Sequence, residues 1–190
     1  MNITELYDRT PSAWKANKEL AQWLVHTFNP SIIVDLGVDY GYSSYVLAEN
    51  PVGTVYAVDW FQGDQHAGYR DTYSYVTSAI AEFSLTNIKV IKADFTHLAK
   101  TWAAPIDILH IDGEHTYEAV SRDYANWFDH VEDDGIILFH DTVTFKDSVG
   151  VFFEELCIPK INFTEDNGLG IASRSQLIID SITKYINRAV

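Results

Sequence analysis

The stretch SIIVDLGVDYGYSSYVLAEN, residues 31–50, decides the fold of this 190-residue chain. Its first six residues form an apolar, β-branched run that is typical of a buried strand and ends at Gly37. After a second glycine, Gly41, the pattern favours a helix that Ser43 or Ser44 is expected to cap. Glycine permits a tight turn and the close approach of a ligand. The stretch therefore predicts a strand, a glycine turn and a helix with free N–H groups at its start, which is equally well read as a ligand site or as a plain strand-to-helix turn.

Strands and helices alternate outward from this unit, which predicts an α/β fold. We expect seven strands, at 31–36, 55–58, 88–91, 106–111, 135–139, 161–163 and 170–173. Helices are expected at 20–28, 42–49, 71–83, 117–128 and 145–156, whereas 177–188 mixes strand and helix character. The prediction is a doubly wound, mainly parallel sheet with helices on both faces. We expect one domain, with a helical segment at 1–30, a core at 31–142 and terminal strands and a helix at 143–190.

The composition limits the partners, the location and the ligands that we expect for the protein. The formal net charge is −14 and no run of basic residues occurs, so nucleic acid is not an expected partner. No apolar run approaches the length needed to span a bilayer, so a membrane is not expected either. The single cysteine, Cys157, allows neither an internal disulfide nor a zinc pair. The first residues lack the pattern of a signal peptide, and we expect a cytoplasmic protein. Aromatic residues make up 14% of the chain; core packing is the usual cause, but aromatic side chains also line small-molecule pockets.

Acidic residues follow several predicted strands at the edge where α/β sheets bind ligands. Asp59 ends the second strand, and an acid at this place binds ribose hydroxyls in nucleotide-binding sheets. After the third strand, Asp94 has the chemistry to accept from an adenine amino group while Phe95 packs on a ring. Taken alone, each acid is equally well read as a solvated strand end.

The fourth and fifth strands end in a richer set of polar residues: Asp112, His115, His140 and Asp141. Adjacent strand ends are expected to bring these side chains together. Carboxylates with imidazole suit a divalent metal, and a histidine suits a general base. The alternative is structural, because strand-end carboxylates often cap helices and a histidine beside an aspartate is often a plain hydrogen-bonded pair.

Together these segments resemble the class I, Rossmann-like S-adenosylmethionine-dependent O-methyltransferases, and most closely the small-molecule group called methyltransferase family 24. The matching motifs are the glycine stretch, IDGEHTYEAVSRDYANW at 111–127 and FHDT at 139–142. The resemblance implies S-adenosylmethionine as cofactor, contacted by Asp35, Gly37, Gly41, Ser43, Asp59, Trp60, Asp94 and Phe95. It also implies a Mg²⁺ or Mn²⁺ site at Asp112, His140 and Asp141. His140 departs from the oxygen ligand that a hard cation prefers.

The expected reaction is transfer of a methyl group to a hydroxyl of a small molecule, with the base among Asp112, His115 and His140. Two other classes stay open: a protein that binds the cofactor or its product without transferring anything, and a nucleotide-binding oxidoreductase. The glycine spacing disfavours the oxidoreductase, because it is not GxGxxG. The short chain leaves little room for a separate lid, so a homodimer that completes the pocket is a further expectation.

Overall fold

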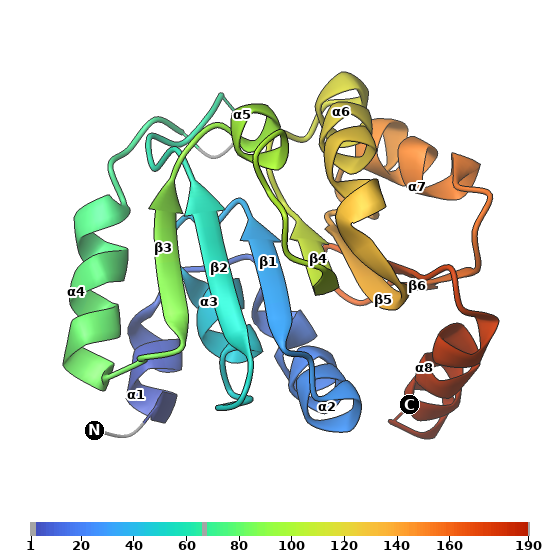
Figure 1. The fold of residues 1–190 in the computed structure, drawn as a ribbon, viewed down its shortest axis with the longest axis horizontal. Helices are drawn as coiled ribbons and strands as arrows, with labels where there is room; N and C mark the ends of the chain where they lie inside the picture. Colours follow the sequence, from blue (N-terminus) through green and yellow to red (C-terminus); the bar gives the residue numbers. More distant parts are fainter. Residues whose placement is uncertain (1–2, 66–67, 190) are drawn as a thin grey trace.

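The computed structural model describes residues 3–65 and 68–189, so His66 in the polar loop lies outside the described residues. The chain forms one sheet with the strand order β3-β2-β1-β4-β5-β7-β6 (Figure 1). Strands β1 to β5 pair in parallel, whereas β7 runs antiparallel to both β5 and β6. The strands are β1 (Ile32–Leu36), β2 (Thr54–Asp59), β3 (Ile88–Lys92), β4 (Ile106–Ile111), β5 (Val131–His140), β6 (Lys160–Phe163) and β7 (Leu169–Ala172).

Helices cover both faces of the sheet because alternate strand residues feed two separate hydrophobic cores. Ile33 packs into one core and Val34 into the other. The first core receives α1 (Ile3–Arg9), α2 (Lys18–Phe28), α3 (Tyr42–Leu47), α4 (Tyr73–Phe83) and α8 (Gln176–Ala189). The second core receives α5 (Phe95–Ala99), α6 (Tyr117–Trp127) and α7 (Val151–Glu155), of which α6 and α7 lie side by side in Figure 1.

The predicted fold class is confirmed, and the differences are local. The segment 145–156 is not one helix, because a π-helical turn, Lys146–Gly150, precedes α7. The ambiguous segment 177–188 is helix α8, whose apolar residues at helical spacing include the buried Ile179 and Ile182. The short helix α5 escaped sequence reasoning because five residues carry too little periodicity.

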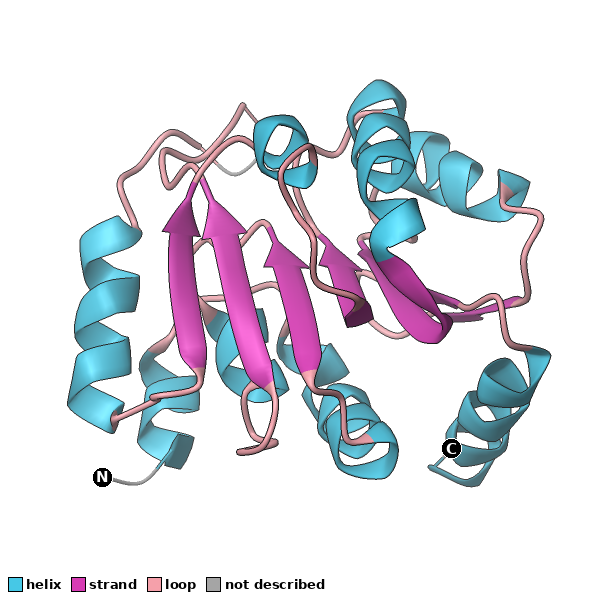
Figure 2. Cartoon of the chain, viewed as in Figure 1, coloured by secondary structure: helices cyan, strands magenta, loops and turns pink. Residues whose placement is uncertain are grey.

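Both glycines of the opening stretch have left-handed backbone, with φ of 96° at Gly37 and 91° at Gly41. A Cβ atom on Gly37 would lie 1.9 Å from the carbonyl oxygen of Asp112. The turn after β1 therefore passes directly against the end of β4, and only glycine fits there. Figure 2 shows the loops that gather beyond the strand ends at this edge of the sheet.

None of the helices in the described parts of the chain is both long and apolar enough to cross a bilayer.

Candidate active site

A cavity of about 550 Å³ opens at the carboxyl edge of the sheet. Its walls are the loops that follow β1 to β5 and the segment 11–14 before α2. Most of the predicted site residues line it: Gly37, Ser43, Asp59, Trp60, Asp94, Phe95, Asp112, His115, His140 and Asp141. Asp35 and Gly41 are not part of the lining.

Asp35 is buried behind the cavity lining, which corrects the expectation of a direct cofactor contact. It supports the glycine turn from the interior of the protein. The side chain is fully buried, and its Oδ2 accepts hydrogen bonds from the hydroxyls of Ser43 and Ser44. The predicted serine cap is also wrong, because Gly41 is the N-cap residue of α3 and both serines turn to Asp35 instead. The carboxylate thus holds the first turn of α3 against β1.

A buried relay links Asp35 to the N-terminal segment. The indole Nε1–H of Trp14 donates to Nε2 of His110 at 3.1 Å, and the His110 Nδ1 lies 2.7 Å from Asp35 Oδ1. Since an indole only donates, Nε2 of His110 must carry the lone pair and Nδ1 the hydrogen. His110 is therefore the packed, hydrogen-bonded histidine that its place inside a strand suggests.

Trp14 is a site residue that sequence reasoning missed. It is buried and lines the cavity, and its ring centroid lies 6.5 Å from that of His140. The neighbouring Ala13 carbonyl accepts from Asn167 Nδ2 at 3.0 Å, which ties this segment to the turn between β6 and β7. The sequence analysis placed residues 1–30 in a helical segment, and nothing local in residues 11–14 marks a cavity wall.

Asp59, the predicted ribose-binding acid, lines the cavity and also organises the glycine turn. Its Oδ2 accepts from the backbone N–H groups of Val38 and Asp39, at 2.8 and 3.0 Å, and its Oδ1 accepts from Phe61. Burial raises the pKa of this carboxyl, while the three backbone donors oppose the rise. Because a carboxylate offers about four acceptor positions, these bonds leave Asp59 room for one ribose hydroxyl rather than two.

The rim beside the glycine turn carries an ion pair. Asp39, at φ 46°, binds Arg70 through its carboxylate, with Nη2 2.6 Å from Oδ2 and Nε 3.1 Å from Oδ1. Both side chains line the cavity. The pair ties the loop after β2 to the turn after β1.

The far side of the cavity holds two more acids. Asp94 is exposed, and its Oδ1 caps helix α5 by accepting from the backbone N–H of His97 at 2.8 Å. Asp123, on α6, is buried and also lines the cavity. Burial raises the pKa of Asp123 to about 6, against a partial opposing effect of Arg122. Sequence reasoning quoted Asp123 only as part of a motif and gave it no role.

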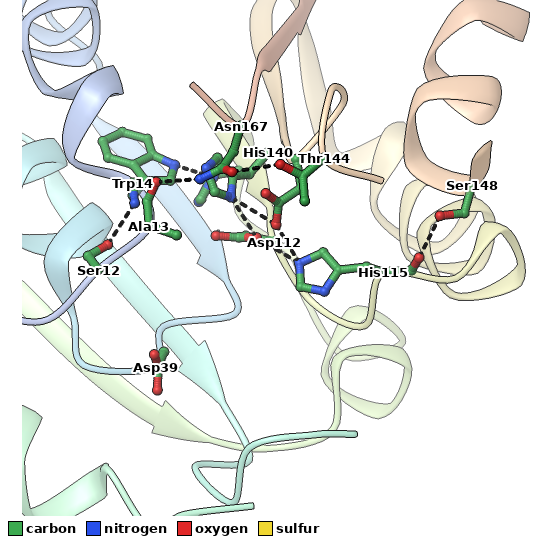
Figure 3. Close-up of polar contacts among 12 residues, drawn as sticks. Ser12, Ala13, Trp14, Asp39, Asp112, His115, His140, Thr144, Ser148 and Asn167 are labelled. Atoms are coloured by element: carbon green, nitrogen blue, oxygen red, sulfur yellow. Dashed lines mark hydrogen bonds and ion pairs between the residues drawn. The ribbon is translucent and has the colours of Figure 1, made fainter. Parts of the chain in front are cut away.

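The cluster expected at the ends of β4 and β5 is assembled as predicted in space (Figure 3). Nε2 of His115 lies 2.8 Å from Asp141 Oδ2 and 3.4 Å from Asp112 Oδ1. Nδ1 of His140 lies 3.2 Å from Asp112 Oδ1 and 3.3 Å from Asp141 Oδ2. The His115 ring stacks on Phe145, with centroids 4.4 Å apart. Each imidazole therefore bridges the same two carboxylates.

This mutual pairing shifts the pKa values of all four groups. Burial lowers the pKa of each imidazole, but the charges of Asp112 and Asp141 and the hydrogen bonds to them raise it overall to about 10. Burial alone would raise the pKa of Asp112, and the neighbouring His140 and His115 hold it well below its usual range instead. The pKa of Asp141 is likewise lowered. Without a bound cation, the two carboxylates thus favour the protonated form of each imidazole, whereas a cation held by the carboxylates would favour the neutral form.

One part of this cluster has the geometry of a metal site. Ligand atoms of Asp112, His115 and Asp141 all lie within 4.8 Å of one another. The sequence expectation had His140 in place of His115, and the structure differs because His115 reaches back from the loop after β4 between the two acids. Two carboxylates with one imidazole suit Mn²⁺ or a similar divalent ion better than Ca²⁺, which prefers ligands that are all oxygen.

Comparison with known proteins places this site in a family context. A family described as "Methyltransferase domain" matches residues 34–142 of the chain. Uncharacterized protein y4gI of Sinorhizobium fredii is 33% identical over 172 residues. The match covers 84% of this chain but 19% of that protein, so the chain spans about a fifth of the length of the curated relative.

Solved structures share the fold at low identity. The O-methyltransferase TomG from Streptomyces achromogenes, in complex with S-adenosylmethionine, has a TM-score of 0.66 at 15% identity, with 88% of each chain covered. An O-methyltransferase from Bacillus cereus, in complex with S-adenosylhomocysteine, has a TM-score of 0.65 at 14% identity, covering 89% of this chain and 86% of that one. The Podospora anserina methyltransferase PaMTH1 has a TM-score of 0.67 at 12% identity, covering 83% and 77%.

Proposed function

The chain belongs to a family of methyltransferase domains of the class I, S-adenosylmethionine-dependent kind, and from that premise we propose that it methylates an oxygen atom of a small molecule. Bound S-adenosylmethionine would supply a sulfonium methyl group for direct displacement. The protein's part is to align donor and acceptor and to take up the proton of the acceptor hydroxyl.

The observation that carries this proposal is the division of one cavity into two chemically different ends. Asp59 and the glycine turn supply a place for a ribose and the amino-acid part of the cofactor. Asp112, His115 and Asp141 supply a polar, partly buried place for an acceptor oxygen. A protein that only binds the cofactor has no use for the second end, which disfavours the non-catalytic alternative.

The donor set at the second end fits a divalent cation. Asp112, His115 and Asp141 would hold it, and the cation would supply a lowered pKa to a bound hydroxyl. The chain's own acids serve acceptor placement as well, since both carboxylates face the cavity.

His140 is the residue best placed to exchange a proton with the acceptor. Its Nδ1 is held by Asp112 and Asp141, which orients the ring in the manner of a base with its supporting carboxylate. Its Nε2 is buried and has no hydrogen-bond partner among the described residues. His115, by contrast, directs Nε2 to the carboxylates and is fixed by stacking on Phe145.

Calorimetric titration with S-adenosylmethionine and S-adenosylhomocysteine, with EDTA and then with Mn²⁺ or Mg²⁺, tests the proposal. We expect micromolar binding of both compounds and an added heat of metal binding that Asp112→Ala removes. A screen of hydroxyl-bearing small molecules with methyl-labelled cofactor then identifies the acceptor.

Absence of binding of either compound by the folded protein would overturn the proposal. Cofactor binding with no methyl transfer to any acceptor, and no effect of Asp112→Ala on metal binding, would favour the non-catalytic reading instead.

A further inference from the structure

Acidic side chains dominate the charged groups that line the cavity. Eight carboxylates belong to the lining, and the opposing groups are two guanidinium groups and two imidazoles. Even if both imidazoles are counted as cations, eight negative charges stand against four positive ones, which leaves a net charge of −4. A divalent cation bound in place of the two protons would leave the same net charge. The cavity is therefore acidic in either state of the cluster at the ends of β4 and β5.

Both arginines of the lining already lie against carboxylates. Arg70 forms the ion pair with Asp39 at the rim, with Nη2 2.6 Å from Oδ2. Nε of Arg122 lies 3.4 Å from Asp123 Oδ1. In the described parts of the chain, the lining contains no lysine. An anionic group of a ligand would thus meet no guanidinium group that lacks a carboxylate beside it.

The other acids supply the excess of negative charge. Asp59 and Asp64 follow β2, Asp94 follows β3, and Glu114 follows β4. Asp59 accepts from backbone N–H groups, Asp94 caps α5 through a backbone N–H, and Glu114 accepts from the amide of Gln65 at 3.3 Å. These donors are neutral, so they stabilise the carboxylates but leave the negative charge in place.

One buried carboxylate shows directly that the charge is not balanced within the wall. Asp123 lines the cavity and is 1% exposed. Its Oδ2 is buried and has no hydrogen-bond partner in the part of the chain that the structure describes. A buried carboxylate is stable when donors or cations surround it, and here few do. A ligand that brings positive charge or donors relieves this shortage, whereas an anion worsens it.

Charges on the walls of a cleft act together, because the surrounding protein has a low dielectric constant and concentrates the field in the cleft. Two lysines, Lys15 and Lys92, lie outside the lining over the rings of Tyr42 and Tyr73. Both are exposed, so water screens their charges and they reduce the field of the cavity only in part.

We infer that the cavity selects its ligands by charge: it binds the sulfonium cofactor more tightly than the neutral product, and it takes an acceptor without an anionic group. This inference rests on the proposed use of S-adenosylmethionine. In the transfer, the bond between methyl carbon and sulfur breaks and its electron pair stays on sulfur, while the acceptor oxygen bonds the methyl group and gives up its proton to a base. S-adenosylhomocysteine therefore loses the attraction to the acidic walls, which favours its exchange for new cofactor.

Calorimetry in the presence of EDTA tests the inference with three ligands: S-adenosylmethionine, S-adenosylhomocysteine, and sinefungin, which has an ammonium group in place of the methylated sulfur. Sinefungin separates the effect of charge from that of the sulfonium methyl. At about 0.01 M salt we expect both cations to bind about tenfold more tightly than S-adenosylhomocysteine. At about 1 M salt, where the Debye length is about 3 Å, this preference should shrink.

Two variants with the same change of charge show whether the lining causes the preference. Glu114→Lys reverses a charge of the lining, whereas Glu132→Lys reverses an exposed charge at the start of β5, at the opposite edge of the sheet. The preference for the two cations should fall severalfold in Glu114→Lys and stay in Glu132→Lys. S-adenosylhomocysteine is neutral, so its affinity should change little in either variant and reports that the site is intact.

The acceptor screen carries the second half of the inference. Each hydroxyl compound with a carboxylate is paired with its amide, and we expect the amide to be methylated faster. A carboxylate methylated faster than its amide would overturn this half. Binding of S-adenosylhomocysteine as tightly as the two cations at low salt, or an equal loss of preference in both variants, would overturn the first half. Failure of the wild type to bind any of the three ligands would instead refute the proposed function, so the failures are distinguishable.

Discussion

The two ends of the cavity treat buried charge in opposite ways. At the end where we propose that the acceptor binds, Asp112 and Asp141 face two imidazoles, and all four groups are paired with one another. At the end beside α6, Asp123 has a buried oxygen that lies next to Phe95 and Gly113 and has no hydrogen-bond partner in the described part of the chain. Pairing preorganises the first end, whereas at the second end few donors stabilise the buried charge of Asp123. The difference predicts which substitutions weaken the cavity and which one stabilises the fold.

The largest effect is expected from a substitution in the paired cluster at the ends of β4 and β5. Asp112→Asn removes a carboxylate shared by His115, His140 and the candidate cation. We expect Mn²⁺ affinity to fall about 100-fold or more, since even a lost outer-shell partner lowers metal affinity by about 10- to 100-fold. Titration followed by the electron spin resonance signal of free Mn²⁺ measures it. Asp94→Asn is the control, and an unchanged Mn²⁺ affinity in Asp112→Asn would remove the metal from this site.

At the other end of the cavity, a substitution is expected to stabilise the protein. Asp123→Asn should stabilise the ligand-free protein, because the raised pKa of about 6 means that ionised Asp123 destabilises the fold at neutral pH. Each pKa unit corresponds to about 1.4 kcal/mol, and the new amide is itself imperfectly paired, so we expect a gain of about 1 to 2 kcal/mol.

The pH dependence of this stabilisation follows from proton uptake by Asp123 in the wild-type protein. Between the ordinary carboxyl pKa of about 4 and about 6, folded Asp123 holds a proton that the unfolded chain releases, so wild-type stability rises as pH falls through this window. The advantage of Asp123→Asn should therefore be full above pH 6 and shrink below it. Arg122, Asp94 and Glu114 are the charges that act on Asp123, and they stay in place in the variant. Thermal unfolding at pH 5 and pH 7.5 checks this, and a destabilised variant at pH 7.5 would contradict it.

Between the two ends, Asp59 lines the cavity and holds the glycine turn, where we propose that the cofactor binds. Asp59→Asn replaces one of the acceptor oxygens that hold the N–H groups of Val38, Asp39 and Phe61 with a donor. We expect S-adenosylhomocysteine affinity to fall about tenfold, the effect of about one lost charge-assisted hydrogen bond. Calorimetry beside Asp94→Asn measures it. Equal losses in both variants would mean that Asp59 has no special place in the cofactor site.

The sequence predicted the fold and the gathering of the four polar side chains at the ends of β4 and β5 because both depend on local patterns. Strand periodicity located β1 to β5, and motifs at the ends of β4 and β5 named Asp112, His115, His140 and Asp141 before any geometry was known. The sequence did not predict which acidic side chains would have hydrogen-bond partners. Asp35 and Asp123 look like equivalent acids in the sequence, yet one is bonded on both oxygens by Ser43, Ser44 and His110 and the other is not. Such differences arise from contacts between residues far apart in the chain, which no local spacing encodes.

The smallest expected effect concerns the hydrogen-bond chain from Trp14 through His110 to Asp35. It tests whether this chain acts independently of the cluster at the ends of β4 and β5. Trp14→Phe keeps an aromatic ring near His140 but removes the N–H that Nε2 of His110 accepts. We expect about 1 to 2 kcal/mol of destabilisation, because a buried acceptor is left unpaired. That corresponds to a Tm lower by about 2 to 8 °C for a chain of this size. Trp60→Phe, at a half-exposed position on the same cavity, is the matched control and should shift the Tm far less. Because His110 does not belong to the paired cluster, Mn²⁺ affinity should stay unchanged in Trp14→Phe. A lost metal affinity would show instead that the relay and the acceptor end act as one unit.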